Sequence, residues 1–234
     1  MTRKRNRHLL RNIAVAVTII AVVVVGAAAA IYWNGSRQPQ VTVGAPLRVG
    51  DTFTYKLAGS TVLGSSNETS PAEFNEYNDT DYYQVSVTAI QGTEVTLETT
   101  WQFKNGTQLA NPQEIDLSTG SVAEVLEFTY LYPANLTVND NLYPQETSGL
   151  IVNSTSTQKF ADSVRPTDYW STSDQFMNVG DTSGGTMRYD FIGVNFDRAT
   201  GMMVSLTRIQ FFTSPEIQLT TTWELTGTNA WTVK

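Results

Sequence analysis

Ten residues from Glu94 to Phe103, with the sequence EVTLETTWQF, decide the fold class of this 234-residue chain. Large apolar side chains recur at intervals of two or four, at Val95, Leu97, Trp101 and Phe103, and charged or polar residues occupy the other positions. Side chains two positions apart lie on the same face of a β-strand. The stretch therefore predicts a strand with one buried face and one face in contact with water.

The preceding segment repeats this pattern. Asp81 to Gln91 places Tyr83, Val85, Val87 and Ala89 on one face. Between the two segments, Gly92-Thr93 has the length of a tight turn. The two segments are therefore predicted to pair as an antiparallel hairpin.

A second alternating pattern lies near the C-terminus, where Ile217, Leu219, Trp223 and Leu225 alternate with polar residues. An apolar-rich segment, Met202 to Phe212, follows the turn Asp197-Arg198-Ala199-Thr200-Gly201, and Gly201 is the expected left-handed residue. Further strands are predicted over Thr52 to Leu57 and Arg188 to Phe196. We expect an all-β domain of about eight to ten strands, either an antiparallel β-sandwich or a curved half-barrel-like sheet.

Two further features bear on the topology. The region from Thr107 to Asp174 has four prolines and no clear periodicity, which favours long loops that cross one end of the sheet. A weak repeat, Val49-Gly50-Asp51-Thr52, Val138-Asn139-Asp140-Asn141 and Val179-Gly180-Asp181-Thr182, is typical of a turn that precedes a strand. Coincidence between common turn residues explains the repeat equally simply.

Charge and hydropathy are strongly asymmetric at the N-terminus. The first 12 residues hold five basic side chains and no acidic one, and residues 13–33 (IAVAVTIIAVVVVGAAAAIYW) carry no formal charge. A helix of that length spans about 31 Å, which matches the hydrocarbon layer of a bilayer. The remaining chain has ten basic and 22 acidic side chains.

This asymmetry predicts a single-pass signal anchor, because a basic segment stays on the cytoplasmic side of a membrane. We divide the chain into a basic cytoplasmic tail (1–12), a transmembrane helix (13–33), a linker (34–46) and an extracytoplasmic all-β domain (47–234). The alternative is a secretory signal cleaved near Ala27 to Ala30, although the apolar stretch is long for such a signal.

Acceptor sequences for N-glycosylation support an exported domain. Asn-x-Ser/Thr occurs at six positions, Asn34, Asn67, Asn78, Asn105, Asn135 and Asn153. The chain has no cysteine, which is unusual for a eukaryotic ectodomain. An archaeal cell surface fits this combination better.

Several motifs together suggest a family. They are the N-terminal anchor, the strand opener Val49 to Tyr55 (VGDTFTY), Asn135 to Asp140, the hairpin Phe196 to Met202, and the endings Trp223 to Thr226 and Asn229 to Trp231. With these motifs the chain resembles uncharacterised archaeal membrane-anchored, N-glycosylated surface proteins. This resemblance implies an all-β ectodomain and a location, and no activity. In strand order and in its Asp-Arg-Ala-Thr-Gly hairpin the chain is also similar to half-barrel carriers of the lipoprotein-localisation type, which implies a sheet around a hydrophobic cavity.

The residue inventory excludes most catalytic chemistries. Without cysteine there is no thiolate nucleophile, and the single histidine, His8, lies in the basic tail. The acidic domain disfavours nucleic acid as a partner. Oxygen donors cluster at Asn78 to Asp81 and Asn139 to Asn141, but the spacing of a calcium loop is missing. Carboxylate pairs for glycoside hydrolysis are Asp79 with Asp81, Glu73 with Glu76 and Asp190 with Asp197; solvated charge is the simpler interpretation of each.

We therefore predict no catalytic, cofactor-binding or metal-binding residues. Neighbouring aromatic residues, Tyr82-Tyr83, Tyr130 to Tyr132 and Tyr169-Trp170, are more typical of core packing than of sugar binding. The expected function is a membrane-anchored extracellular interaction or scaffold module that contacts membrane lipid through its anchor and envelope proteins or glycans through its domain. The alternative is a tethered carrier of lipid or another hydrophobic ligand, with Trp101, Phe103 and Trp223 beside a cavity of roughly 300–1,000 Å³.

Overall fold

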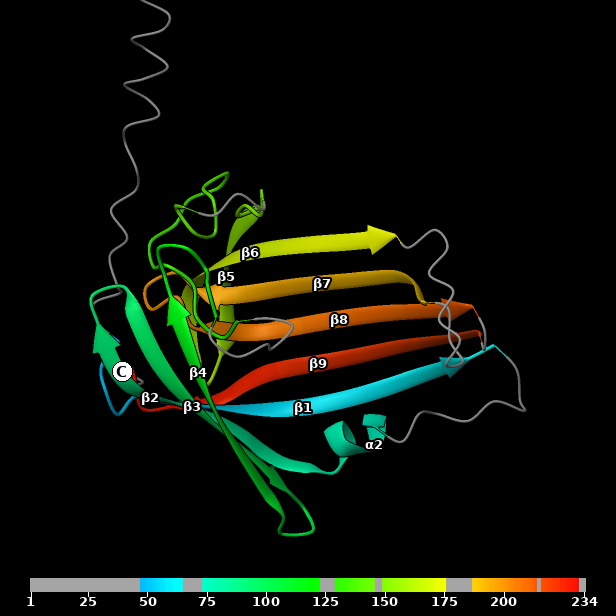
Figure 1. Cartoon of the computed structure of the whole chain (residues 1–234). Helices are drawn as coiled ribbons and strands as arrows, with labels where there is room; N and C mark the ends of the chain where they lie inside the picture. Colours follow the sequence, from blue (N-terminus) through cyan, green and yellow to red (C-terminus); the bar gives the residue numbers. More distant parts are fainter. Residues whose placement is uncertain are drawn as a thin grey trace, which may run out of the picture. The chain divides into compact units, whose positions relative to one another are not determined.

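A computed structural model of the chain describes residues 47–64, 73–122, 129–145, 149–175, 187–213 and 216–231. These residues form nine β-strands and one short helix (Figure 1). The strands are β1 (Thr52–Leu63), β2 (Thr80–Gln91), β3 (Glu94–Phe103), β4 (Gln108–Asp116), β5 (Ser154–Phe160), β6 (Ser163–Gln175), β7 (Met187–Asp197), β8 (Met203–Thr213) and β9 (Glu216–Thr228), and the helix is α2 (Glu73–Asn78).

All nine strands belong to one antiparallel sheet with the order β4-β3-β2-β1-β9-β8-β7-β6-β5. Two meanders, β1 to β4 and β5 to β9, are joined where the first strand pairs with the last. The all-β class and the expected number of strands are confirmed. The predicted transmembrane helix over 13–33 lies outside the described residues, and among those residues no helix is long and apolar enough to cross a bilayer.

The hairpin predicted on either side of Gly92 is formed by β2 and β3. Gln91 pairs with Glu94. Gly92 has a φ of +65°, which glycine adopts at little cost because it has no side chain. Val95 and Leu97 are completely buried. The alternating pattern therefore identified both the strand and its buried face.

One position of that hairpin was assigned to the wrong face. The register between β2 and β3 shifts between Val87 and Ala89, so that Ala89 lies opposite Thr96 on the polar face. Ile90 packs against the core in its place. A bulge adds one residue to one strand and reverses the alternation beyond it, which a strict period of two cannot anticipate.

The C-terminal elements follow the prediction. Gly201 has a φ of +76°, and its N–H donates to the Asp197 carbonyl oxygen (2.8 Å) in the turn between β7 and β8. The alternating apolar residues of β9, Ile217, Leu219, Trp223 and Leu225, are all buried. The two strands predicted near the C-terminus, β8 and β9, pair antiparallel along their length.

The region from Thr107 to Asp174 is more regular than predicted, because β4, β5 and most of β6 lie in it. Two of these, β4 and β5, are the edges of the sheet. An edge strand buries few side chains, so its sequence lacks alternation, and it tolerates a proline such as Pro112. The expectation of long loops holds only for the connection between β4 and β5.

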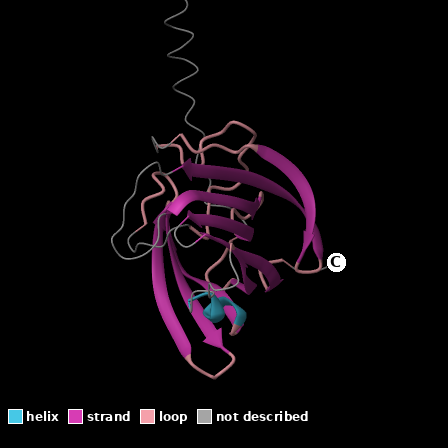
Figure 2. Cartoon of the chain, turned by 90° about the vertical axis from the view of Figure 1, so that its right-hand side faces the viewer, coloured by secondary structure: helices cyan, strands magenta, loops and turns pink. Residues whose placement is uncertain are grey.

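That connection supplies much of the core. Its fully or nearly buried members include Leu117, Tyr130, Leu131, Tyr132, Leu136, Leu142, Tyr143 and Val152. The Tyr132 N–H donates to Gly201 O (2.9 Å) and the Met203 N–H to Tyr130 O (2.8 Å), which fixes the connection against the start of β8. Figure 2 shows the strands curving around loops on their inner side.

The repeated tetrapeptide forms the same turn twice but begins only one strand. Asp51 Oδ2 accepts the N–H of Arg48, and Asp140 Oδ2 accepts that of Thr137, each at 2.7 Å. The first turn leads into β1, whereas Asn141 makes only an isolated bridge with Ile151. The third copy, at 179–182, lies outside the described residues. The repeat therefore reflects turn chemistry at these two positions.

Candidate functional site

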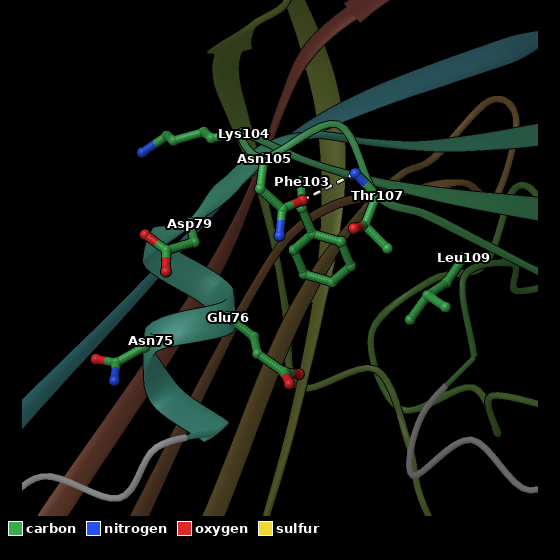
Figure 3. A pocket seen from close by; sticks show the side chains of 8 residues that line it. All are labelled: Asn75, Glu76, Asp79, Phe103, Lys104, Asn105, Thr107 and Leu109. Atoms are coloured by element: carbon green, nitrogen blue, oxygen red, sulfur yellow. Dashed lines mark hydrogen bonds between the residues drawn. The ribbon is translucent and has the colours of Figure 1, made fainter.

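A groove lies between α2 and the hairpin turn that connects β3 to β4 (Figure 3). Its volume is about 580 Å³. The lining is largely polar, with two apolar side chains, and consists of Asn75, Glu76, Asp79, Phe103, Lys104, Asn105, Thr107 and Leu109. Leu109 is 48% exposed, so the groove is open to solvent on its β4 side.

The hairpin wall is a tight turn over residues 103–107. The Gly106 N–H donates to Phe103 O and the Phe103 N–H donates to Thr107 O, both at 2.9 Å. Gly106 has a φ of +88°. This is a three-residue loop closed by a glycine bulge, for which the sequence Asn105-Gly106 is well suited.

The helix wall is held by hydrogen bonds from three directions. The Asn78 side chain accepts from the Gly59 N–H (3.1 Å) and donates to Gly59 O (2.9 Å). The amide thus makes the two hydrogen bonds that the backbone of a paired strand would make. Lys104 Nζ donates to Asn78 O (2.6 Å), and Thr80 Oγ1 donates to Glu76 O (2.8 Å). The groove is therefore bounded by two elements that are fixed to each other and to β1.

Two carboxylates that line this groove, Glu76 and Asp79, come from two different predicted acid–base pairs. Figure 3 shows Glu76 and Asp79 directed to opposite sides of α2. Asp190 is paired with Arg208 (2.6 Å) and Asp197 with Arg165 (2.7 Å). Within the described residues, no group of three Asp, Glu, His or Cys side chains is placed to hold a metal ion.

Two of the donors suggested for calcium, Asn78 and Asp140, are committed to the fold. Asn78 bonds to the backbone of β1, and Asp140 Oδ2 accepts both the N–H and the hydroxyl of Thr137 (2.7 and 2.8 Å). Asn139 has a left-handed backbone with a φ of +72°. These contacts explain the presence of Asn78, Asn139 and Asp140 by turn and backbone hydrogen-bond chemistry.

The large aromatic residues on the apolar face pack against one another. Trp223 is 5% exposed and contacts Tyr83 (ring centroids 4.6 Å apart) and Tyr130 (6.0 Å). Tyr83 Oη and Tyr130 Oη are 2.6 Å apart and share a hydrogen bond. Trp101 stacks on Phe103 (4.8 Å), whose ring lines the groove. Core packing is therefore the role of Tyr83, Tyr130, Tyr132 and Trp170, all of which are buried.

Four of the six predicted glycosylation sites are described, and their side chains differ in what they contact. All four asparagines, Asn78, Asn105, Asn135 and Asn153, are exposed. Asn105 Oδ1 accepts the Thr107 N–H (2.8 Å), and Asn153 Oδ1 accepts the Ser171 N–H (2.7 Å). Asn135 has a left-handed backbone, with a φ of +60°. Asn34 and Asn67 lie outside the described residues.

Local patterns did not reveal two buried ion pairs beside the turn between β7 and β8. Arg165 binds both carboxylate oxygens of Asp197 (2.7 and 2.9 Å), and Asp197 Oδ2 also accepts the Thr200 N–H and hydroxyl. Arg198 Nη2 donates to Asp168 Oδ1 (2.5 Å). Both carboxylates are completely buried, so the interpretation of Asp197 as solvated charge was wrong.

In the Arg198–Asp168 pair, the largest cause of the pKa shift differs between the two side chains. Burial raises the pKa of Asp168, and the Arg198 hydrogen bond opposes that rise; the same hydrogen bond raises the pKa of Arg198. The difference follows from exposure, since the Arg198 side chain is 33% exposed and keeps part of its hydration, whereas Asp168 keeps none. The ion pair therefore holds the turn in place, and the free-energy cost of desolvation falls mainly on the Asp168 carboxylate.

Comparison of the chain with protein families, with curated proteins and with solved structures gives no match.

Proposed function

We propose that this chain is a single-pass, membrane-anchored glycoprotein whose all-β domain lies outside the cell and acts as a non-enzymatic interaction or scaffold module of the envelope. The charge asymmetry around residues 13–33 and the six acceptor sequences support the location. The absence of cysteine supports an archaeal surface. The four described acceptor asparagines are exposed, as modified residues must be.

The observation that carries the choice between scaffold and carrier is the filling of the apolar face. A carrier needs an empty cavity there. In this chain Trp223 is covered by Tyr83 and Tyr130, and the connection between β4 and β5 contributes completely buried residues such as Leu131. The centre of the apolar face is therefore packed with side chains. The pocket of about 350 Å³ that remains beside Trp223 is lined by more polar and charged residues than apolar ones, which favours a polar partner over a lipid.

The groove beside α2 does not favour the carrier either. Six of its eight lining side chains are polar or charged. Desolvating Glu76, Asp79 and Lys104 against a hydrocarbon chain is unfavourable. A hydrated partner, such as a glycan or a polar protein surface, matches the lining.

The test places the full chain, with a C-terminal tag, in an N-glycosylating archaeal host. Protease added to intact cells is expected to remove the tag and to leave the basic tail inside. A protease site inserted in residues 34–46 then releases the domain from washed membranes without detergent, and the released domain is extracted with organic solvent and analysed by mass spectrometry.

The scaffold proposal requires a released domain that carries glycan and less than stoichiometric lipid. One bound lipid per domain overturns the choice of scaffold over carrier. A tag that resists protease until the cells are lysed overturns the proposed location.

A further inference from the structure

The turn that forms one wall of the groove places three residues on the same side. Phe103, Asn105 and Thr107 are spaced by two, and the glycine bulge at Gly106 closes the loop between them. Figure 3 shows the Phe103 ring, the Asn105 amide and the Thr107 side chain gathered at the mouth of the groove. Asn105 and Thr107 are the acceptor and the hydroxyl residue of one glycosylation sequence.

The Asn105 amide is oriented for modification. Its Oδ1 accepts the Thr107 N–H (2.8 Å), so the rotation of the amide is restricted and Nδ2 is directed away from the backbone. Nδ2 makes no hydrogen bond to the described residues, and the side chain is exposed. A saccharide on Nδ2 therefore breaks no contact of the folded turn.

The Phe103 ring provides a surface for the first sugar. One face stacks on Trp101, with ring centroids 4.8 Å apart, and the ring also lines the groove. The C–H groups on one face of a pyranose form an apolar patch that gains from contact with an aromatic face, both by burial and through the electron-rich ring. Among the four described sites, only Asn105 has an aromatic residue two positions earlier.

Asn78 shows the opposite arrangement. Its amide nitrogen donates to Gly59 O, and Thr80, which completes its acceptor sequence, is 8% exposed and accepts the Trp101 Nε1–H (2.6 Å). Attachment of a sugar at Asn78 requires separation of α2 from β1. Exposure of an asparagine is thus insufficient to define an acceptor in this fold.

We propose that Asn105 carries an N-linked glycan whose first sugar packs on Phe103, occupies the mouth of the groove and stabilises the hairpin of β3 and β4. In the transfer, Asn105 Nδ2 forms a bond to C1 of a saccharide supplied by a polyprenyl-phosphate-linked donor. The C1–O bond to phosphate breaks, the phosphate oxygen leaves with the electron pair, and one Nδ2 proton passes to solvent through the transferase. This inference rests on the proposed location of the domain outside the cell.

The experiment compares the full chain with Thr107→Val, which removes the acceptor hydroxyl and keeps both the side-chain volume and the Thr107 N–H. Thr155→Val is the matched control, because it abolishes the site at Asn153, where residue 151 is an isoleucine. Each protein is made in an N-glycosylating archaeal host and in the bacterial cytoplasm. Occupancy is read from glycopeptide masses and Tm from tryptophan fluorescence of the full chain in detergent.

From the glycosylating host, Thr107→Val is expected to lower Tm by about 2–4 °C relative to the parent chain, the shift typical of one lost contact in a domain of this size. Thr155→Val leaves Tm unchanged, and from the bacterial host Thr107→Val does so too. In a Phe103→Leu background the effect of Thr107→Val disappears, because the ring that holds the sugar is gone.

Occupancy at Asn135 or Asn153 without occupancy at Asn105 overturns this inference and leaves the proposed function standing. Equal Tm values for glycosylated parent and Thr107→Val, or the same decrease in both hosts, also overturn it. A chain that carries no glycan at any of its sites overturns the glycoprotein proposal and this inference together.

Discussion

Gly201 occupies a backbone position that leaves no space for a side chain. Its φ is +76°, and a Cβ built there collides with the Tyr132 carbonyl oxygen. Gly201→Ala is expected to lower the free energy of unfolding by about 3–5 kcal/mol, since left-handed strain and overpacking add. Gly92→Ala, at a φ of +65° with nothing within 4 Å of the new Cβ, costs only the strain, about 1–2 kcal/mol. Equilibrium urea unfolding of both variants measures the difference, and equal losses contradict the predicted collision.

Two buried tyrosines differ in whether their hydroxyl groups are satisfied. Tyr55 Oη donates to Met203 O (2.7 Å), whereas Tyr132 Oη has no partner with hydrogen-bond geometry, although Thr129 and Trp170 are close enough to limit the rise in its pKa. Tyr132→Phe is expected to raise the free energy of unfolding at pH 7 by about 1 kcal/mol, because it removes an unpaired buried hydroxyl. Tyr55→Phe is expected to lower it by about 1–2 kcal/mol. Thermal unfolding of the two variants checks the opposite signs; a loss in both shows that Tyr132 Oη is satisfied.

At the scale of elements, one carboxylate connects the turn between β7 and β8 to β6. Asp197 is completely buried and holds Arg165 and Thr200 together. Asp197→Ala is expected to destabilise the domain by about 3–5 kcal/mol, because it leaves the Arg165 charge partly buried without a partner. Asp81→Ala, at an exposed carboxylate of β2, is the control and changes stability by less than about 0.5 kcal/mol. A similar urea midpoint for both variants is inconsistent with a structural role for Asp197.

The elements also show where periodicity works as a predictor. β3 and β9 each bury one face, so their apolar residues alternate and both strands were identified with their faces. β4 exposes most of its side chains and β5 is rich in Ser and Thr, as edge strands often are. Because burial produces the alternating signal, strands that bury little are missed by it.

At the scale of the whole molecule, buried tyrosines make stability sensitive to alkaline pH. Burial raises the pKa of Tyr132 to about 12 from the ordinary value of 10.0, and it also raises the pKa of Tyr55 and Tyr130. Between these values the unfolded chain loses a proton that the folded chain keeps, so the unfolded state binds fewer protons and stability falls as pH rises. The contribution of Tyr132 to the stability is fully present below pH 10 and is lost as the pH rises towards 12.

Each such tyrosine contributes at most about 1.4 kcal/mol per pH unit to this fall. Tyr132→Phe is therefore expected to show a shallower decline of unfolding free energy between pH 10 and 12 than the parent chain. Urea titrations at half-unit pH steps measure both slopes. Parallel curves show that the Tyr132 hydroxyl titrates in the folded state as it does in the unfolded chain.

The candidate site was only partly visible in the sequence. Asn105 was found as an acceptor, and Glu76 and Asp79 as carboxylates, from local spacing alone. The sequence did not show that these residues meet Phe103 and Lys104 around one groove, because α2 and the β3–β4 turn are brought together by long-range bonds such as that from Lys104 to the Asn78 carbonyl oxygen. The Arg165–Asp197 pair was missed for the same reason, because its members are 32 positions apart in the chain.

The sequence by itself determined that the described domain is a β-protein, which of its segments are the half-buried strands, and where glycines close the turns. These properties depend on neighbours within a few positions, whose alternation and φ preferences act locally. The tertiary structure alone decided that β1 pairs with β9, that the connection between β4 and β5 contributes to the core, and that Ile90 replaces Ala89 there. Each of these depends on contacts between residues far apart in the chain, where burial of a whole face outweighs local preference.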